Sequence, residues 1–286
     1  MTPDLVAHRV PTRLGALSVR VGGEGIPTVF WHGMFIDSTT WQPVLELLDA
    51  PRRVILVDGP GHGLSAPLPR VSSIEESAAV ALEVLDALGI AEPVDWVGNA
   101  WGGHVGLRLA ADHPERVRSL VAVGAPTEPV TPAARRKLRL LLAIGTVIGL
   151  TGPARSAVLG TQLTDAGRRD PAVMAVVSAA LDRPSRRSML RAVRSFILGR
   201  TELTSALPSI SCPTLLVVTD DRDDWTPADA GAAVAALPDG RVELVSGART
   251  LVPLERPAEL AALIASFWSG LAGSRVNPLR RRSASR

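Results

Sequence analysis

Short β-branched, apolar runs alternate along this chain with longer helical patterns, and this alternation limits the folds that it can adopt. The short runs predict strands, and the apolar periodicity between them predicts helices. Regular alternation of the two is typical of a mostly parallel sheet covered by helices. The expected strands are Leu17–Val21, Thr28–Trp31, Arg53–Val57, Val94–Gly98, Ser119–Val123, Thr214–Val218 and Val242–Val245. The expected helices are Thr40–Leu48, Ile74–Leu88, Trp101–Asp112, Ala228–Leu237 and Pro257–Trp268.

One long interval, 128–210, interrupts this rhythm. It contains several helical patterns, among them AARRKLRLLLAIG and RRSMLRAVRSFIL, and no convincing strand. An all-helical insertion between two strands predicts a cap over the strand ends, where open α/β sheets bind ligands. We therefore expect an α/β core formed by residues 1–127 and 211–272, a helical cap at 128–210 and a basic, disordered tail at 273–286.

The distribution of charge argues against a nucleic-acid partner. The chain has a formal net charge of +3, but residues 274–286 hold five arginines and no acid, so the remainder carries −2. The longest apolar run, Leu140–Leu150, is too short to cross a bilayer, and no secretory signal pattern is present at the N-terminus. A single cysteine, Cys212, in an apolar run suits a buried core residue in a reducing compartment. We therefore expect a cytoplasmic protein that does not insert stably into a membrane.

The turns that follow the expected strands carry small and polar residues in a definite order. They read WHGM from Trp31, DGPGHGLS from Asp58, GNAWGG from Gly98, DDRDDWTP from Asp220, and ARTL from Ala248. In order and spacing, these turns resemble those of the α/β-hydrolase superfamily, and the resemblance covers the chain from about residue 15 to 270. The resemblance implies the α/β-hydrolase fold, a mostly parallel, doubly wound sheet with an inserted helical cap.

The GNAWGG turn resembles the nucleophile elbow, G-x-S-x-G, in which a sharp strand-to-helix turn exposes the central residue. Gly98, Gly102 and Gly103 supply the small positions that this turn needs. The central residue is Ala100. Because a methyl group cannot attack a carbonyl carbon, no acyl-enzyme is expected at this position.

The resemblance also implies an acid after the seventh strand and a histidine after the eighth. Asp223 has the spacing of the acid, with Asp221 and Asp224 as near alternatives, whereas Thr250 occupies the histidine position. All five histidines precede residue 114, so no later strand end can present one. In a well-studied serine hydrolase, loss of the nucleophile or base lowers turnover by about 10⁶. Ordinary serine-type hydrolysis is therefore not expected.

The donors of an oxyanion hole are retained by position. In the family, these are backbone N–H groups after the His-Gly turn and after the nucleophile, which correspond here to Met34 and Trp101. Backbone donors survive side-chain replacement, and the N-terminus of the following helix adds its dipole. The site could therefore still polarise a carbonyl or stabilise an enolate.

His32 and His104 have two interpretations each, and His62 has one. His32, in the pocket, could be an acid or a base, but in this motif it more often braces its loop. His62 is expected to be a structural turn residue with Asp58 as its partner. His104, one helical turn past Ala100, is the best-placed remaining imidazole, although packing of its helix is the preferred interpretation.

Other pocket candidates are also open to more than one interpretation. Asn99 precedes Ala100 in the elbow. Trp41, Trp101 and Trp225 could form an aromatic wall for a planar ligand or could pack in the core. Asp223 could transfer protons or could cap the helix that begins near Pro227.

No cofactor is expected. The chain has no cluster of cysteines or histidines at metal-ligand spacing, which argues against a metal site. The glycines of GPGHG could suggest a dinucleotide fold, but Pro67-Leu68-Pro69 follows and prevents a helix from starting there. The basic cluster Arg135-Arg136-Lys137 could begin a membrane-surface helix, and a cap helix lining the pocket is the preferred interpretation.

Three hypotheses for function follow. The chain could be an enzyme that uses the retained donors for non-covalent lyase, isomerase or hydrolase chemistry, with Asp223 or His104 transferring protons. It could instead be a non-catalytic binder of a small molecule, a pseudoenzyme. It could also be an esterase-like hydrolase inactivated by an engineered alanine, although Thr250 speaks against this. The apolar cap suggests a small, largely apolar carbonyl compound as ligand, and the sequence does not indicate an oligomeric state.

Overall fold

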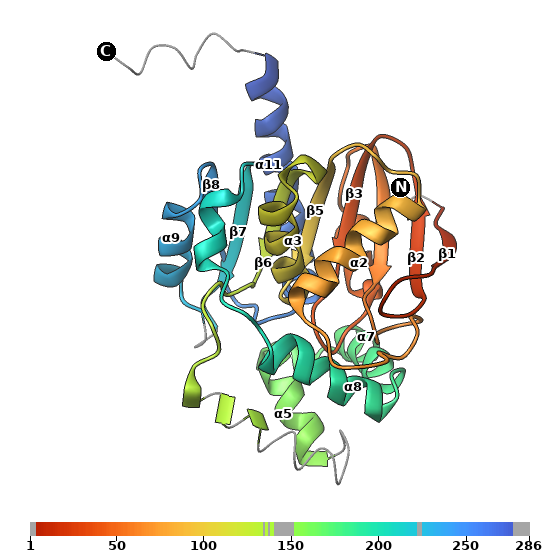
Figure 1. Ribbon diagram of the computed structural model, residues 1–286. Coiled ribbons are helices and arrows are strands. Elements are labelled where there is room, and N and C mark those ends of the chain that lie inside the picture. Colours follow the sequence, from red (N-terminus) through yellow and green to blue (C-terminus); the bar gives the residue numbers. More distant parts are fainter. Residues whose placement is uncertain (1–3, 134, 137, 140–151, 222–224, 277–286) are drawn as a thin grey trace.

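An eight-stranded sheet forms the centre of the molecule (Figure 1). The computed structural model describes residues 4–133, 135, 136, 138, 139, 152–221 and 225–276. The strands lie in the order β1-β2-β4-β3-β5-β6-β7-β8. Their bounds are β1 Val6–Val10, β2 Leu17–Gly22, β3 Ile26–Trp31, β4 Arg52–Asp58, β5 Val94–Asn99, β6 Val117–Val123, β7 Thr214–Thr219 and β8 Gly240–Val245.

The predicted mostly parallel sheet is confirmed. Neighbouring strands from β4 to β8 in the sheet order all pair in parallel, whereas β2 pairs antiparallel with both β1 and β4. The residues of β5 and β7 are all buried. Continuous burial of this kind is expected where helices cover both faces of a sheet.

Helices cover the sheet in two layers, each with its own apolar cluster. One cluster includes residues of α2, α3 and α9, and the other includes residues of α1, α10 and α11. The bounds of these helices are α1 Gln42–Leu45, α2 Ile74–Ala87, α3 Trp101–Asp112, α9 Pro227–Ala235, α10 Val252–Glu255 and α11 Pro257–Val276. The short 3₁₀ helices η1 Ser38–Trp41 and η2 Pro114–Arg116 complete this part of the chain. Cys212 is buried, as predicted.

The regular elements described between β6 and β7 are all helical. They include α5 Gly152–Gln162, α6 Asp165–Arg169, α7 Pro171–Asp182, α8 Arg186–Val193, the π-helix η3 Arg194–Leu198 and the 3₁₀ helix η4 Thr204–Ser209. Figure 1 shows α5, α7 and α8 grouped below one end of the sheet. Within the described residues, no helix is both long and apolar enough to cross a membrane.

Three local predictions were wrong. Strand β1 was missed, because four of its five residues are exposed and its VAHRV sequence has no apolar face. The expected helix Thr40–Leu48 is a 3₁₀ turn followed by the short α1, with a proline in the first turn of α1. Helix α11 continues to Val276, so it includes the first residues of the predicted tail. Residues 277–286 lie outside the described part.

Candidate active site

The backbone at Ala100 forms the sharp turn that the elbow motif requires. Ala100 joins β5 to α3 with φ 47° and ψ −105°, a conformation that L-residues rarely adopt. Its N–H donates to the Val123 carbonyl at 2.7 Å. A Cβ added to Gly98 would lie 2.2 Å from the Gly102 backbone, and one added to Gly102 would lie 2.1 Å from the Trp31 oxygen. Close contact between β3, β5 and α3 therefore holds the turn, although its central residue carries no nucleophile.

Ala100→Gly is expected to raise the free energy of unfolding by about 1 kcal/mol, because glycine adopts this conformation without the strain of a Cβ. Urea denaturation measures the change. The matched control is Ala111→Gly in α3, which should lower the free energy of unfolding by about 0.5–1 kcal/mol. Equal destabilisation by both substitutions would contradict a strained turn.

The backbone N–H groups of Met34 and Trp101 lie on the two segments that meet at the elbow. Trp101 is the first residue of α3, where backbone N–H groups lack an acceptor within the helix. Across the described chain, neither N–H has a protein acceptor. The following residue, Phe35, has φ 67°, so the Met34 loop is also in an unusual conformation.

His32 braces this loop. Its Nδ1 lies 2.6 Å from the Gly33 carbonyl, and its Nε2 accepts from the Gly59 N–H at 2.9 Å. Because a carbonyl only accepts, Nδ1 carries the proton and both ring nitrogens are bonded to backbone. Burial lowers the pKa of His32 and keeps the ring neutral. This geometry favours the bracing interpretation over an acid or base.

The expected pairing of His62 with Asp58 is wrong. His62 Nδ1 donates to the Pro60 carbonyl at 3.1 Å, whereas the Asp58 carboxylate accepts from Ser38 and from the Leu64 N–H. The two-residue separation from Pro60 makes this a local turn contact. His62 is therefore a structural turn residue, as predicted, but with a different partner.

Acidification is expected to destabilise the protein through His62. Burial, with a contribution from His32, lowers the pKa of His62 to about 3. The unfolded chain, with a histidine pKa near 6.5, then binds more protons than the folded chain between those values, so stability falls as pH falls below about 6.5. The loss attributable to His62 is about 2 kcal/mol at pH 5. Urea denaturation at pH 7 and pH 5 should show a smaller pH difference for His62→Phe; an unchanged difference would contradict this origin.

His104 lies within α3, and its contacts are those of a packing residue. Its side chain is buried, and Nε2 donates to the Pro126 carbonyl at 3.0 Å. That contact joins α3 to the loop after β6. The geometry favours the packing interpretation of His104.

Thr250 and Asn99 connect the elbow to the turn after β8. Asn99 donates from Nδ2 to the Thr250 carbonyl at 2.8 Å and to the Val123 carbonyl at 3.3 Å. The Thr250 hydroxyl donates to the carbonyl of Thr161, at the end of α5, at 2.9 Å. The hydroxyl is thus engaged with the segment between β6 and β7.

The acid turn after β7 is paired with an arginine. Asp221 accepts two hydrogen bonds from Arg249, from Nη2 at 2.9 Å and from Nε at 3.1 Å. The other candidates, Asp223 and Asp224, lie outside the described residues. No histidine of the described chain pairs with Asp221.

The three tryptophans do not form one wall. Trp41 makes an edge contact with Phe30, at 5.4 Å between ring centres, in the cluster on the α11 side of the sheet. Trp101 and Trp225 belong to the cluster on the other side. The core interpretation is therefore favoured for Trp41.

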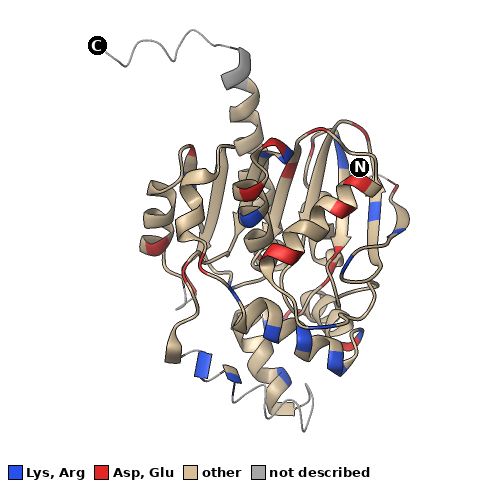
Figure 2. Cartoon of the chain, in the orientation of Figure 1, with Lys and Arg blue, Asp and Glu red and all other residues tan. Residues whose placement is uncertain are grey.

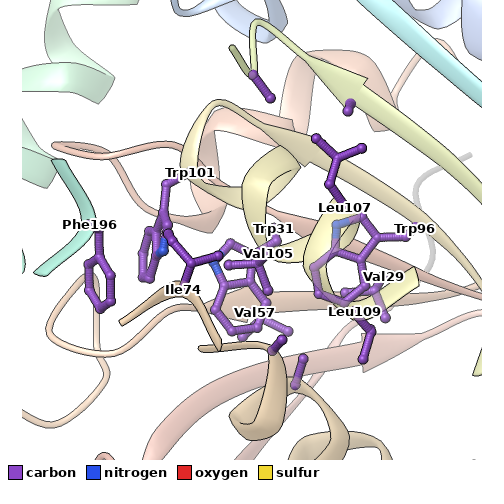
Figure 3. Packing of buried hydrophobic residues seen from close by; sticks show 14 of the residues in the cluster. Val29, Trp31, Val57, Ile74, Trp96, Trp101, Val105, Leu107, Leu109 and Phe196 are labelled. Carbon is purple, nitrogen blue, oxygen red and sulfur yellow. The ribbon is translucent and has the colours of Figure 1, made fainter. Parts of the chain in front are cut away.

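Phe196 is an aromatic neighbour of the elbow that the sequence did not indicate. Its ring stacks on Trp101 with 4.3 Å between centres and 20° between planes (Figure 3). The contact joins η3 to the start of α3. Phe196 lies in an ordinary apolar helical pattern, so no local signal distinguishes it from a core residue.

The described residues offer little for a metal ion. Among them, no group of three or more histidine, cysteine, aspartate or glutamate side chains lies together.

Comparisons with known proteins identify the family and the fold of this chain. Residues 28–263 match the model of the alpha/beta hydrolase family, so the chain belongs to that family. A 2-hydroxy-6-oxononadienedioate/2-hydroxy-6-oxononatrienedioate hydrolase from Pseudomonas sp. is 26% identical over 268 residues, covering 88% of this chain and 92% of the relative. A 2-hydroxymuconate semialdehyde hydrolase from Pseudomonas sp. (strain CF600) is 42% identical over 106 residues, covering 36% of this chain and 37% of the relative.

The fold has close structural counterparts. The enol-lactonase from Burkholderia xenovorans LB400 superposes with a TM-score of 0.81 at 22% sequence identity, covering 92% of this chain and 100% of that one. Two further curated relatives align with this chain over 40% of their own length. The fold and family are thus shown, and the relatives named are hydrolases of small molecules.

Proposed function

We propose that this chain binds a small, largely apolar carbonyl compound at the elbow, without forming an acyl-enzyme. The observation that carries the proposal is an intact elbow turn with a methyl group at its centre, beside two backbone N–H groups that lack a protein acceptor. Such donors suit a carbonyl oxygen. Ala100 itself is half-buried.

The arrangement of imidazoles supports binding over serine-type hydrolysis. His32 and His62 are buried and bonded to backbone carbonyls, and His104 donates to Pro126. Thr250 takes the histidine position, and its hydroxyl already donates to Thr161. A serine-type mechanism needs a base within hydrogen-bond reach of the nucleophile.

The surroundings support an apolar ligand. Met34, Phe35, Trp101 and Phe196 are buried near the turn. In this proposal the helices between β6 and β7 act as a cap, since η3 contacts the elbow helix through the Phe196–Trp101 stack.

Binding of 2-nonanone, a simple apolar ketone, tests the proposal. We expect saturable binding by calorimetry, weakened about tenfold in Met34→Pro, because the substitution removes one N–H donor. Met34→Leu keeps the donor and serves as the matched control, with circular dichroism confirming the fold of both. Equal affinity for both variants, or no saturable binding by the unaltered chain, would overturn the proposal.

A further inference from the structure

Charge is separated between the two parts of this chain. Residues 128–210 hold thirteen lysines and arginines against five acidic residues, a net charge of +8. Residues 1–127 together with 211–272 hold thirteen against twenty-three, a net charge of −10. Figure 2 shows several blue segments on the helices between β6 and β7 and most of the red segments in the sheet part. The net charge of the whole chain is therefore small only because a positive part and a negative part nearly cancel.

Six of these thirteen basic residues lie along α8, η3 and the residues that flank them. Between Asp182 and Glu202 the sequence has six arginines and no acidic residue. The side of α8 that includes Met189, Ala192 and Val193 is buried. Arg187 and Arg194 are exposed, and neither has an acidic partner among the described side chains. The outward face of this segment is therefore basic.

The inward face of the same segment contacts the candidate site. Phe196 stacks on Trp101, the residue after Ala100. The Ser188 hydroxyl accepts from the Leu68 N–H at 2.9 Å, and the Ser195 hydroxyl accepts from the Ser72 N–H at 2.8 Å. The segment formed by α8 and η3 therefore has a basic outer face and an inner face that contacts the elbow helix.

An exposed apolar side chain adjoins this basic surface. Val71, which is 51% exposed, precedes Ser72, and Ser72 is hydrogen-bonded to the residue after Arg194. Arginines beside exposed aliphatic side chains are typical of surfaces that meet the headgroup region of a bilayer. Clusters of basic residues at this density bind anionic lipid.

We propose that the face formed by α8, η3 and the loop at Val71 docks on an anionic phospholipid surface, without insertion of a helix. We favour a membrane over an acidic protein as the partner. The exposed arginines are spread along the outside of one helical segment, and such an arrangement suits the evenly distributed charge of lipid headgroups better than the specific contours of a protein. The negative sheet part would be repelled by the same surface and would orient the molecule with this face toward the lipid. Uptake of an apolar ligand from the bilayer would follow, and that step alone rests on the proposed function.

Vesicle co-sedimentation of the full chain tests the docking. We expect binding to phosphatidylcholine vesicles that contain phosphatidylglycerol, little binding to pure phosphatidylcholine, and loss of binding at high salt. Each basic residue at an anionic surface contributes about fivefold to partitioning, so Arg187→Gln/Arg194→Gln should bind roughly 25-fold more weakly. The matched control, Arg53→Gln/Arg241→Gln, removes the same charge from the sheet part and should bind like the unaltered chain.

Three results would overturn the docking proposal. Binding that survives Arg187→Gln/Arg194→Gln would place the contact elsewhere, such as in the arginines of residues 275–286. Equal loss in both double variants would indicate a response to net charge alone. Retention on immobilised polyglutamate without vesicle binding would indicate an acidic protein as the partner. Calorimetry with 2-nonanone in the absence of lipid reports on the proposed function separately.

Discussion

Ala100→Ser is expected to leave hydrolysis of p-nitrophenyl butyrate at the rate of the unaltered chain. The substitution supplies a hydroxyl at the elbow but no base to activate it, since the resemblance implies Thr250 at the histidine position and the Thr250 hydroxyl donates to Thr161. In a well-studied serine hydrolase, loss of the base alone lowers turnover by about 10⁶. Release of p-nitrophenol, followed by absorbance, measures the rate.

Ala100→Ser/Thr250→His is the companion variant. Any gain in hydrolysis should appear only when both side chains are present, because nucleophile and base act as a unit. Activity in Ala100→Ser alone would mean that one of the five histidines reaches the elbow, which contradicts the geometry of His32, His62 and His104.

The turn after β8 supplies the C-terminal cap of α5, and its removal is expected to have the largest effect on stability. The last carbonyls of a helix lack partners within it. Here Arg249 Nη1 donates to the Gly160 carbonyl, the Thr250 hydroxyl donates to Thr161, and the backbone N–H groups of Thr250 and Leu251 donate to Gln162 at 3.1 Å. The arginine charge also complements the negative end of the helix dipole.

Arg249→Ala/Thr250→Val should lower the free energy of unfolding by about 3 kcal/mol, because it removes charge-assisted and neutral hydrogen bonds from partly buried carbonyls. Urea denaturation measures this loss, and hydrogen exchange should show faster exchange in α5. The control is Arg241→Ala, which removes an arginine of β8 that does not bond to α5. Unchanged exchange in α5 would contradict the capping role.

Much of the fold was predictable because its signals are local. The bounds of α3 match the predicted helix Trp101–Asp112, since the turn at Ala100 precedes it and the apolar period that follows contains no proline before Pro114. The elbow motif likewise predicted a sharp turn at Ala100, where φ is 47°. Strand β1 carried no such signal, because edge strands with exposed side chains lack an alternating pattern.

The contacts around the site were less predictable because they join distant segments. Thr250 and Thr161 are 89 residues apart, and Arg183, which pairs with the buried Asp37, is 146 residues from it. No local pattern marks either pair. Asp221, a near alternative for the acid that the resemblance implies, pairs with Arg249, and nothing near Arg249 in the sequence indicates this pair.

The most direct measurement combines binding and turnover of one compound, methyl octanoate. Calorimetry should show saturable binding to the unaltered chain, while chromatography of the same sample should detect no octanoate above the level without protein. Repeated turnovers that release octanoate from the unaltered chain would contradict a site that holds a carbonyl compound without serine-type hydrolysis.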